Sequence, residues 1–209
     1  MKTIRRISPV VFPARPLETE IRGAWQVVLQ YEKEHEEAPF VTDLSHRLKW
    51  ILQDAQIGAF TPFGIRIPEV PGESVLQGGF VVSRTGRTGA SIYQLWGEAA
   101  ASPQEAAFTE VTEGYMMTAV VGRGVFGIAE KLTSMDLGDP QKEAPFLVQG
   151  PFSHVPSQVV VLKRNGLDGA FLVACSRGYA KDMVHAIMDT GEEFGLRPAG
   201  TKRFESALA

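Results

Sequence analysis

The stretch from Met116 to Leu132, MMTAVVGRGVFGIAEKL, decides between two fold classes. Gly122, Gly124 and Gly127 follow an apolar run and precede a helical pattern, in the G-x-G-x-x-G spacing of a dinucleotide-binding loop. Such a loop belongs to a parallel βαβ unit, with an acidic residue about 20 positions later at the end of the next strand. Here the next residues, TSMDLGDPQKEAPF, read as a loop, and the strand near Val159 enters an antiparallel hairpin. We therefore interpret the glycines as a tight strand-to-helix turn of the scaffold.

Two segments of the chain share this antiparallel pattern. Residues 78–98 and residues 156–175 each contain two β-rich runs around a glycine-containing turn, TGRTG in one and RNGLDG in the other. A shift of 80 positions aligns identical residues of the two hairpins, and a shift of 68 aligns the strands before them. We predict an α+β fold of duplicated, β-rich halves with mainly antiparallel sheets, at about residues 18–98 and 108–209. The small, polar residues between the halves are predicted to be a linker.

The remaining elements are predicted from periodicity and turn residues. Apolar side chains at helical spacing predict a helix over residues 18–37, and residues 40–53 are predicted as one or two strands. Residues 54–78, rich in proline and glycine, are predicted as a loop with a short helix. Residues 108–122 are predicted as a pair of strands. A closing amphipathic helix is expected over residues 178–194, with Gly195 as its C-terminal cap. Its core-facing side chains are predicted to be Met183, Ile187 and Phe194.

The composition is typical of a soluble globular protein, with 44% hydrophobic and 22% charged residues. The net charge of −3 gives no electrostatic reason to bind nucleic acid or anionic lipid. No apolar run approaches the roughly 20 residues that cross a bilayer. The single cysteine, Cys175, excludes an intramolecular disulfide, and its apolar neighbours indicate a buried strand thiol. Residues 1–17 are basic and broken by prolines, unlike a signal peptide, so we expect a cytoplasmic protein with an extended N-terminal arm.

The histidines suggest no metal site, because all four are widely spaced. His46 lies in DLSHR, where Asp43 could orient its imidazole for acid–base chemistry. The alternative is a turn that satisfies its own backbone. No spacing points to a nucleophile paired with a base, and we assign no catalytic residue.

The sequence ACSRGYAKD contains the candidate ligand-binding residues. Ser176, Arg177 and Tyr179 lie where a strand is expected to end and a helix to begin. A helix N-terminus attracts anions, and Arg177 offers a fork of donors for a carboxylate or phosphate. The alternative role for Ser176 is an N-cap. Arg84, in the hairpin tip SRTGRTG, is a further candidate for an acidic group, and the alternative is a solvated tip.

Several stretches resemble the glycine-cleavage T-protein family, the folate-binding-domain superfamily. FVTDLSHRLKWILQ resembles its N-terminal strand pair, and TAVVGRGVFGIAEKLTSMDL resembles its second-half strand, turn and helix. NGLDGAFLV matches a later strand, and AIMDTGEEFGLRPAGTKRFES matches the closing helix and exit. The resemblance covers about residues 40–209 and implies one folate-binding-like domain over residues 18–209. Within the family, ACSRGYAKDM is most similar to the gamma subunits of heterotetrameric sarcosine oxidases.

This resemblance implies a non-catalytic, gamma-like subunit of a multi-subunit, sarcosine oxidase-type flavoenzyme that demethylates amines. Flavin is then expected on partner subunits, and no cofactor is expected to be held firmly by this chain. Where the family has a folate-contacting glutamate, this sequence offers Asp168, which leaves tetrahydrofolate open as a ligand. Two alternatives remain, a stand-alone tetrahydrofolate-dependent aminomethyl or methyl transferase and a binding module without one-carbon chemistry.

The subunit hypothesis also predicts how partners are bound. The partners would be the other subunits of an amine-oxidising complex, with no nucleic acid and no membrane. Such a chain should expose an apolar patch too large for a monomer. The arm from Ile7 to Leu17, with Val10, Val11 and Phe12, is the candidate for docking across a partner.

Overall fold

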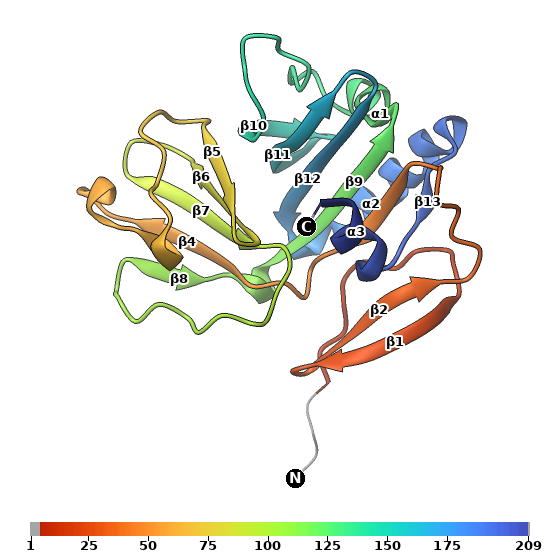
Figure 1. Cartoon of the computed structure of the whole chain (residues 1–209), viewed down its shortest axis with the longest axis horizontal. Coiled ribbons are helices and arrows are strands. Elements are labelled where there is room, and N and C mark those ends of the chain that lie inside the picture. Colours follow the sequence, from red (N-terminus) through yellow and green to blue (C-terminus); the bar gives the residue numbers. More distant parts are fainter. Residues whose placement is uncertain (1–4, 209) are drawn as a thin grey trace.

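The computed structural model describes residues 5–208, and these residues form two β-sheets, a separate β-hairpin and three α-helices (Figure 1). Nearly all strand pairs are antiparallel, and the one parallel pair joins a four-residue strand to a two-residue strand. The predicted α+β class with mainly antiparallel sheets is therefore confirmed. In this part of the chain, no helix combines the length and the apolar character that crossing a membrane requires.

The larger sheet has six strands in the order β10-β11-β12-β9-β3-β13. Its central strands are apolar on both faces, which is the pattern of a sheet covered on both sides. The bounds are β3 (Phe40–Asp43), β9 (Tyr115–Arg123), β10 (Phe146–Phe152), β11 (Val155–Asn165), β12 (Asp168–Ser176) and β13 (Arg197–Pro198).

The second sheet has five strands in the order β5-β6-β7-β4-β8. Its bounds are β4 (Lys49–Gln53), β5 (Ser74–Gln77), β6 (Phe80–Arg84), β7 (Gly89–Gln94) and β8 (Phe108–Glu110). The hairpin outside both sheets consists of β1 (Pro16–Arg22) and β2 (Trp25–Tyr31), and the helices are α1 (Val125–Leu132), α2 (Ala180–Gly191) and α3 (Thr201–Leu208).

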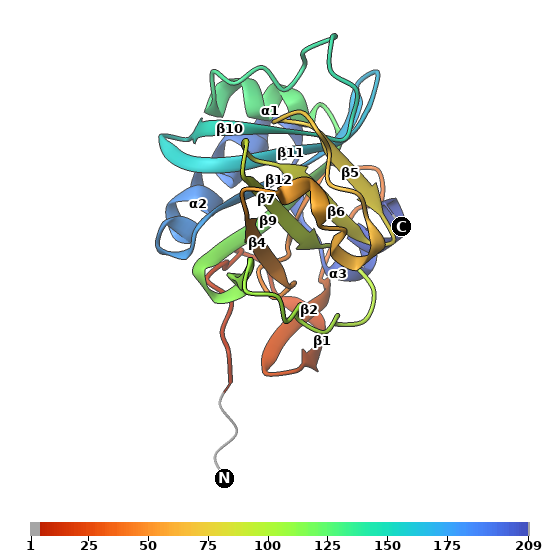
Figure 2. The same cartoon turned by 90° about the vertical axis from the view of Figure 1, so that its left-hand side faces the viewer.

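The molecule is layered. Helices α1 and α2 cover one face of the six-stranded sheet, and the five-stranded sheet and α3 cover the other face (Figures 1 and 2). The far face of the five-stranded sheet packs on the loop before β5, through Trp50 and Ile57. The thiol of Cys175 lies in the helix-facing core, where burial raises its pKa to about 11. The predicted buried thiol is confirmed.

The two sheets have the same order of their first four strands. Each sheet also contains one strand from the half of the chain that forms most of the other sheet. In both sheets, three strands that are consecutive in the chain lie side by side, and the strand that comes before them in the chain lies next to the third. The resulting orders are β5-β6-β7-β4 and β10-β11-β12-β9. The next neighbour is exchanged, because β8 pairs with β4 whereas β3 pairs with β9. The duplicated strand pattern is thus present, and the exchange ties the two segments together. The helices do not recur, since only 3-10 turns lie between β4 and β5.

The predicted helix over residues 18–37 is wrong. Those residues form the hairpin of β1 and β2, in which Arg22 pairs with Trp25 across a tight turn. Gly23 allows this turn because its φ is +60°, and a glycine inside a helix would be unfavourable. In β2 every second side chain is buried, which is the period of a strand.

Three further expectations also need correction. Residues 108–122 contain two strands with a turn, but β8 and β9 lie in different sheets and do not pair with each other. The proline-rich segment 54–78 ends in β5 and is not all loop. The first strand after α1 was expected near Val159, but β10 comes earlier in the chain and pairs with the strand that contains Val159. The strands within residues 40–53, both hairpins and the helix with Gly195 as its left-handed cap are confirmed. The segment expected to link two halves connects β7 to β8, which belong to the same sheet.

The three glycines of the G-x-G-x-x-G pattern are sites of close packing. Gly122 has a φ of +122°, and a Cβ there would lie 2.8 Å from the Cα of Pro39. Gly124 is the left-handed N-cap of α1, and a Cβ on Gly127 would meet the ring of Phe194. Because β9 is antiparallel to both of its neighbours, the corner belongs to no parallel βαβ unit. The interpretation as a strand-to-helix turn is confirmed.

Candidate functional site

The predicted residues Ser176, Arg177 and Tyr179 lie together between β12 and α2, and Arg177 contacts the N-terminal arm. Its guanidinium donates a 2.6 Å hydrogen bond to the carbonyl of Ile7 and lies 5.7 Å from the ring of Trp25. Ser176 occupies the N-cap position of the 3-10 turn that leads into α2, as the alternative predicted, but its side chain makes no cap hydrogen bond. Tyr179 is exposed. Arg177 is thus occupied in holding the arm, and a ligand at this site stays a prediction.

The other two predicted residues lie elsewhere. Arg84 donates to the carbonyls of Gly86 and Arg87 at its own hairpin tip. Asp168 begins β12, at the end of the strand opposite Ser176, and pairs across the sheet with Arg123. The fold therefore does not gather the five candidates into one site, and ligand binding by Arg84 or Asp168 also stays a prediction.

The turn that joins β3 to β4 brings together four ionisable side chains that are buried or partly buried. The sequence between these buried strands, DLSHRLK, brings Asp43, His46, Arg47 and Lys49 within seven residues. The polar residues of this short connection between buried strands indicate the site, and only Asp43 and His46 were predicted from them. In the structure these two do not form a hydrogen bond among the described residues, because Asp43 bonds to other partners.

Lys49 is completely buried, and its ammonium group closes the turn. The Nζ atom donates hydrogen bonds of 2.8 Å to the carbonyl of Ser45 and 2.7 Å to that of Arg47. Burial lowers the pKa of Lys49 to about 7, with the charge of Asp43 acting in the opposite direction. The two carbonyls need only two N–H donors, so the neutral amine can serve them as well as the ammonium.

Asp43 fixes the N-terminal arm to the turn. Its carboxylate accepts a 2.5 Å hydrogen bond from the hydroxyl of Ser8 and a 2.8 Å bond from the amide of Ser45. Burial raises the pKa of Asp43, and these hydrogen bonds oppose the shift. The pKa of His46 is well below its ordinary value because of burial and the nearby charge of Arg47, so the imidazole is neutral at pH 7.

The arm is packed against the body of the protein for much of its described length. Val10 and Phe12 are buried in the helix-facing core, and Phe12 meets the ring of Tyr31 edge-on at 6.1 Å. The expectation that these two side chains dock across a partner is therefore wrong, since the protein's own core occupies them. Val11 and Ile7 are exposed, at 77% and 75%. Residues 1–4 of the expected arm lie outside the described residues.

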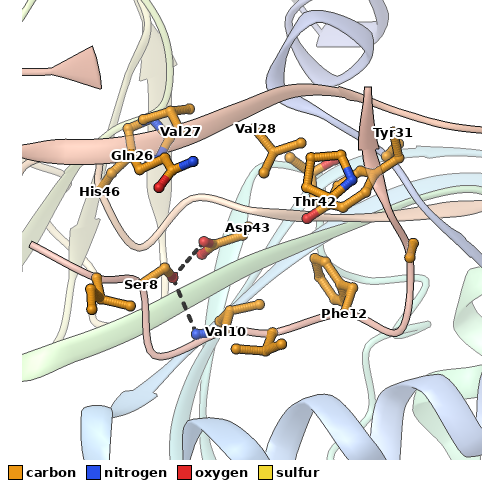
Figure 3. Close-up of a pocket in the computed structure, with 15 residues that line it drawn as sticks. Ser8, Val10, Phe12, Gln26, Val27, Val28, Tyr31, Thr42, Asp43 and His46 are labelled. Atoms are coloured by element: carbon orange, nitrogen blue, oxygen red, sulfur yellow. Dashed lines mark hydrogen bonds between the residues drawn. The ribbon is translucent and has the colours of Figure 1, made fainter. Parts of the chain in front are cut away.

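Two cavities flank the turn, and His46 lines both. A half-open cavity of about 280 Å³ lies between the arm and β2, with Asp43 and Thr42 on its floor (Figure 3). On the other side, a cavity of about 600 Å³ is lined by Arg47, whose guanidinium pairs with Glu205 and donates to the carbonyl of Gly97. Within residues 5–208, no three histidine, cysteine or carboxylate side chains are placed to hold a metal ion.

Comparison with known proteins supports the fold. No protein-family model matches the sequence, and no curated protein matches it. Among solved structures, the fold is similar to that of a chain of heterotetrameric sarcosine oxidase from Corynebacterium sp. U-96, in a complex with pyrrole 2-carboxylate. The TM-score is 0.63, the identity is 13%, and the match covers 77% of this chain and 87% of that one. The resemblance inferred from the sequence is thus confirmed for the fold.

Proposed function

We propose that this protein is a gamma-like, non-catalytic subunit of a multi-subunit flavoenzyme that oxidatively demethylates sarcosine or a related N-methyl amine. The observation that carries the proposal is the structural likeness to a chain of heterotetrameric sarcosine oxidase, which extends over 87% of that chain. The same folding unit therefore makes up most of both polypeptides. Flavin resides on the partner subunits in this proposal.

Exposed apolar side chains near the N-terminus support a role in assembly. Ile7, Val11, Leu17 and Ile21 are all more than half exposed, and we name them the arm–β1 strip. Strand β1 pairs only with β2 among the described residues, so its outer edge is free. A free edge with exposed apolar residues is a surface that soluble proteins usually protect, and a partner subunit would cover it.

The test uses the full chain, tagged and expressed in its native cell, and purified without denaturants. We expect it to purify in a complex that has the visible absorbance of flavin and oxidises an N-methyl amino acid. A double substitution in the strip, Val11→Glu with Ile21→Glu, should release the chain from this complex while its circular dichroism stays unchanged. Val70→Glu changes another valine that is more than half exposed, outside the strip, and should keep the complex intact.

A second measurement distinguishes the alternatives. The isolated chain is titrated with tetrahydrofolate while the fluorescence of its three tryptophans is followed. Micromolar binding together with a stable monomer would favour the stand-alone transferase. A well-behaved monomer that binds no folate and purifies without flavoprotein partners would favour a binding module and contradict the subunit proposal.

A further inference from the structure

We propose that the cavity between the arm and β2 is a binding site for a small alkylammonium cation, with Asp43 as its counter-ion. The arm–β2 cavity is defined by its apolar walls, Val10, Val11, Phe12, Val27 and Val28, and by the polar residues at its floor and ends, Ser8, Gln26, Thr42, Asp43 and His46. This inference does not rest on the proposed function, because it concerns the isolated chain alone.

The cavity has the size and composition of a site for a small ligand. Its volume of about 280 Å³ lies just below the usual range for pockets that hold drug-sized ligands, about 300–1,000 Å³, and so suits a smaller ligand. Valine side chains from the arm and from β2 face each other across it, and a few polar groups converge near Asp43 (Figure 3). An apolar cavity with few convergent polar groups is the usual composition of a ligand site.

Asp43 has unused capacity to bind a cation. An ionised carboxylate offers about four acceptor positions, of which the hydroxyl of Ser8 and the amide of Ser45 use two, and the hydroxyl of Ser45 also lowers the pKa of this carboxyl. No ion pair to Asp43 forms among residues 5–208. Lys49 is the cation that acts on this carboxylate, but its Nζ is hydrogen-bonded to two backbone carbonyls of the turn. A charge-assisted hydrogen bond from a ligand ammonium would complete the carboxylate's partners.

Aromatic rings in the lining of the cavity add a second reason to expect a cation. Phe12 and Tyr31 both line the cavity, and their ring centroids are 6.1 Å apart. The pKa of Tyr31 is raised by burial and by the negative charge of Asp43, so the phenol is neutral at pH 7. Ring faces attract ammonium groups, and methylated ammonium ions benefit most because they are weakly hydrated.

Other polar atoms at the site lack partners in the structure. The hydroxyl oxygen of Thr42, a residue only 1% exposed, and Nε2 of His46 make no hydrogen bond. Buried polar atoms without partners are rare because each costs desolvation free energy. Since His46 is neutral at pH 7, its ring does not repel a cation. An anionic ligand would instead meet the charge of Asp43.

The test is a titration of the full chain followed by amide chemical shifts in two-dimensional NMR. The probes are butylammonium, and its neutral and anionic counterparts, butanol and butyrate. We expect saturable shifts with butylammonium at the amides of Val10, Val28 and Asp43, and at least tenfold weaker binding of the other two probes. Nα-acetyl-lysine methylamide, which presents the same ammonium group on a protein-like backbone, tests whether a free amine or a lysine side chain is the better source.

Two variants and a matched control make the result specific. Asp43→Asn keeps the size of the side chain and should weaken butylammonium binding at least tenfold. Val28→Phe fills the cavity from β2 without touching the carboxylate and should weaken binding to the same degree, so it decides the question if the first variant does not fold. Asp189→Asn removes an exposed carboxylate near the end of α2 and should leave binding unchanged. Equal binding of butanol, no saturable shift, or unchanged binding in a folded Val28→Phe variant would overturn the proposal.

Discussion

Lys49 should make the stability of this protein rise with pH above neutrality. Its pKa is about 7 in the folded chain, against 10.5 for an ordinary lysine. Between these two values the unfolded chain binds one proton more than the folded chain, so the free energy of unfolding increases as the pH rises. The increase is complete at the unfolded pKa. Because the side chain is fully buried, solvent does not screen this effect.

The window from pH 7 to pH 8.5 lies inside the range over which Lys49 acts. Each pKa unit corresponds to about 1.4 kcal/mol, so the free energy of unfolding should rise by about 1.5 kcal/mol across this window. The lowered pKa of His46 acts mainly below its ordinary value of 6.5 and adds only about 0.2 kcal/mol, with the same sign, in this window. Cys175 acts in the opposite direction as the pH approaches 9, because the unfolded thiol ionises and the folded thiol does not, and by pH 8.5 this effect is only about 0.2 kcal/mol.

The assay is urea unfolding followed by tryptophan fluorescence at several pH values. Lys49→Met keeps the length of the side chain without a titrating group, and we expect its unfolding free energy to be flat across the window. Lys181→Met, which removes an exposed lysine from α2, should keep the slope of the unmodified protein. A flat profile for the unmodified protein, or an unchanged slope in Lys49→Met, would refute the assignment of a low pKa to this lysine.

Three further predictions concern the arm, the glycine corner and the exchanged strands. Phe12→Ala should lower the urea-derived stability by about 3–5 kcal/mol, the usual cost of truncating a buried phenylalanine, and a change below 1 kcal/mol would mean that the arm is not part of the core. Gly122→Ala should cost at least about 2 kcal/mol, because of its positive φ and the contact with Pro39, whereas Gly86→Ala, in open space, should change stability by less than about 0.5 kcal/mol; equal effects would contradict the packing argument. Residues 108–209 expressed alone lack β3 and should show no cooperative thermal transition, and a sharp transition would show that the exchange is dispensable.

Local sequence signals were enough to predict the two hairpins and the closing helix. In each hairpin, glycines mark the turn and alternating apolar residues mark the strands, and these signals need no knowledge of distant contacts. The hairpin of β1 and β2 was misread because Trp25, Val28 and Leu29 also fit a helical spacing. Burial against α3 and the core selected the strand period instead, and the turn at Gly23 agrees with it.

Long-range pairing could not be predicted in the same way. The sequence shows that residues 40–43 and residues 108–110 are strands, but nothing local specifies that each joins the sheet of the other segment. The same limit applies to the site. DLSHR pointed to Asp43, yet its hydrogen-bond partner Ser8 lies 35 residues away in the chain. The short polar turn between two buried strands correctly indicated where the ionisable side chains gather. The hydrogen-bond partners of these side chains could not be predicted, because they depend on tertiary structure.

The measurement that tests the central proposal most directly is native mass spectrometry of the complex purified through the tagged full chain. Our account predicts one assembly in which this 22.8 kDa chain is present in a fixed ratio to subunits that hold flavin. Detection of the chain only as a free species of that mass, in preparations whose flavin-dependent amine oxidation is undiminished, would contradict it.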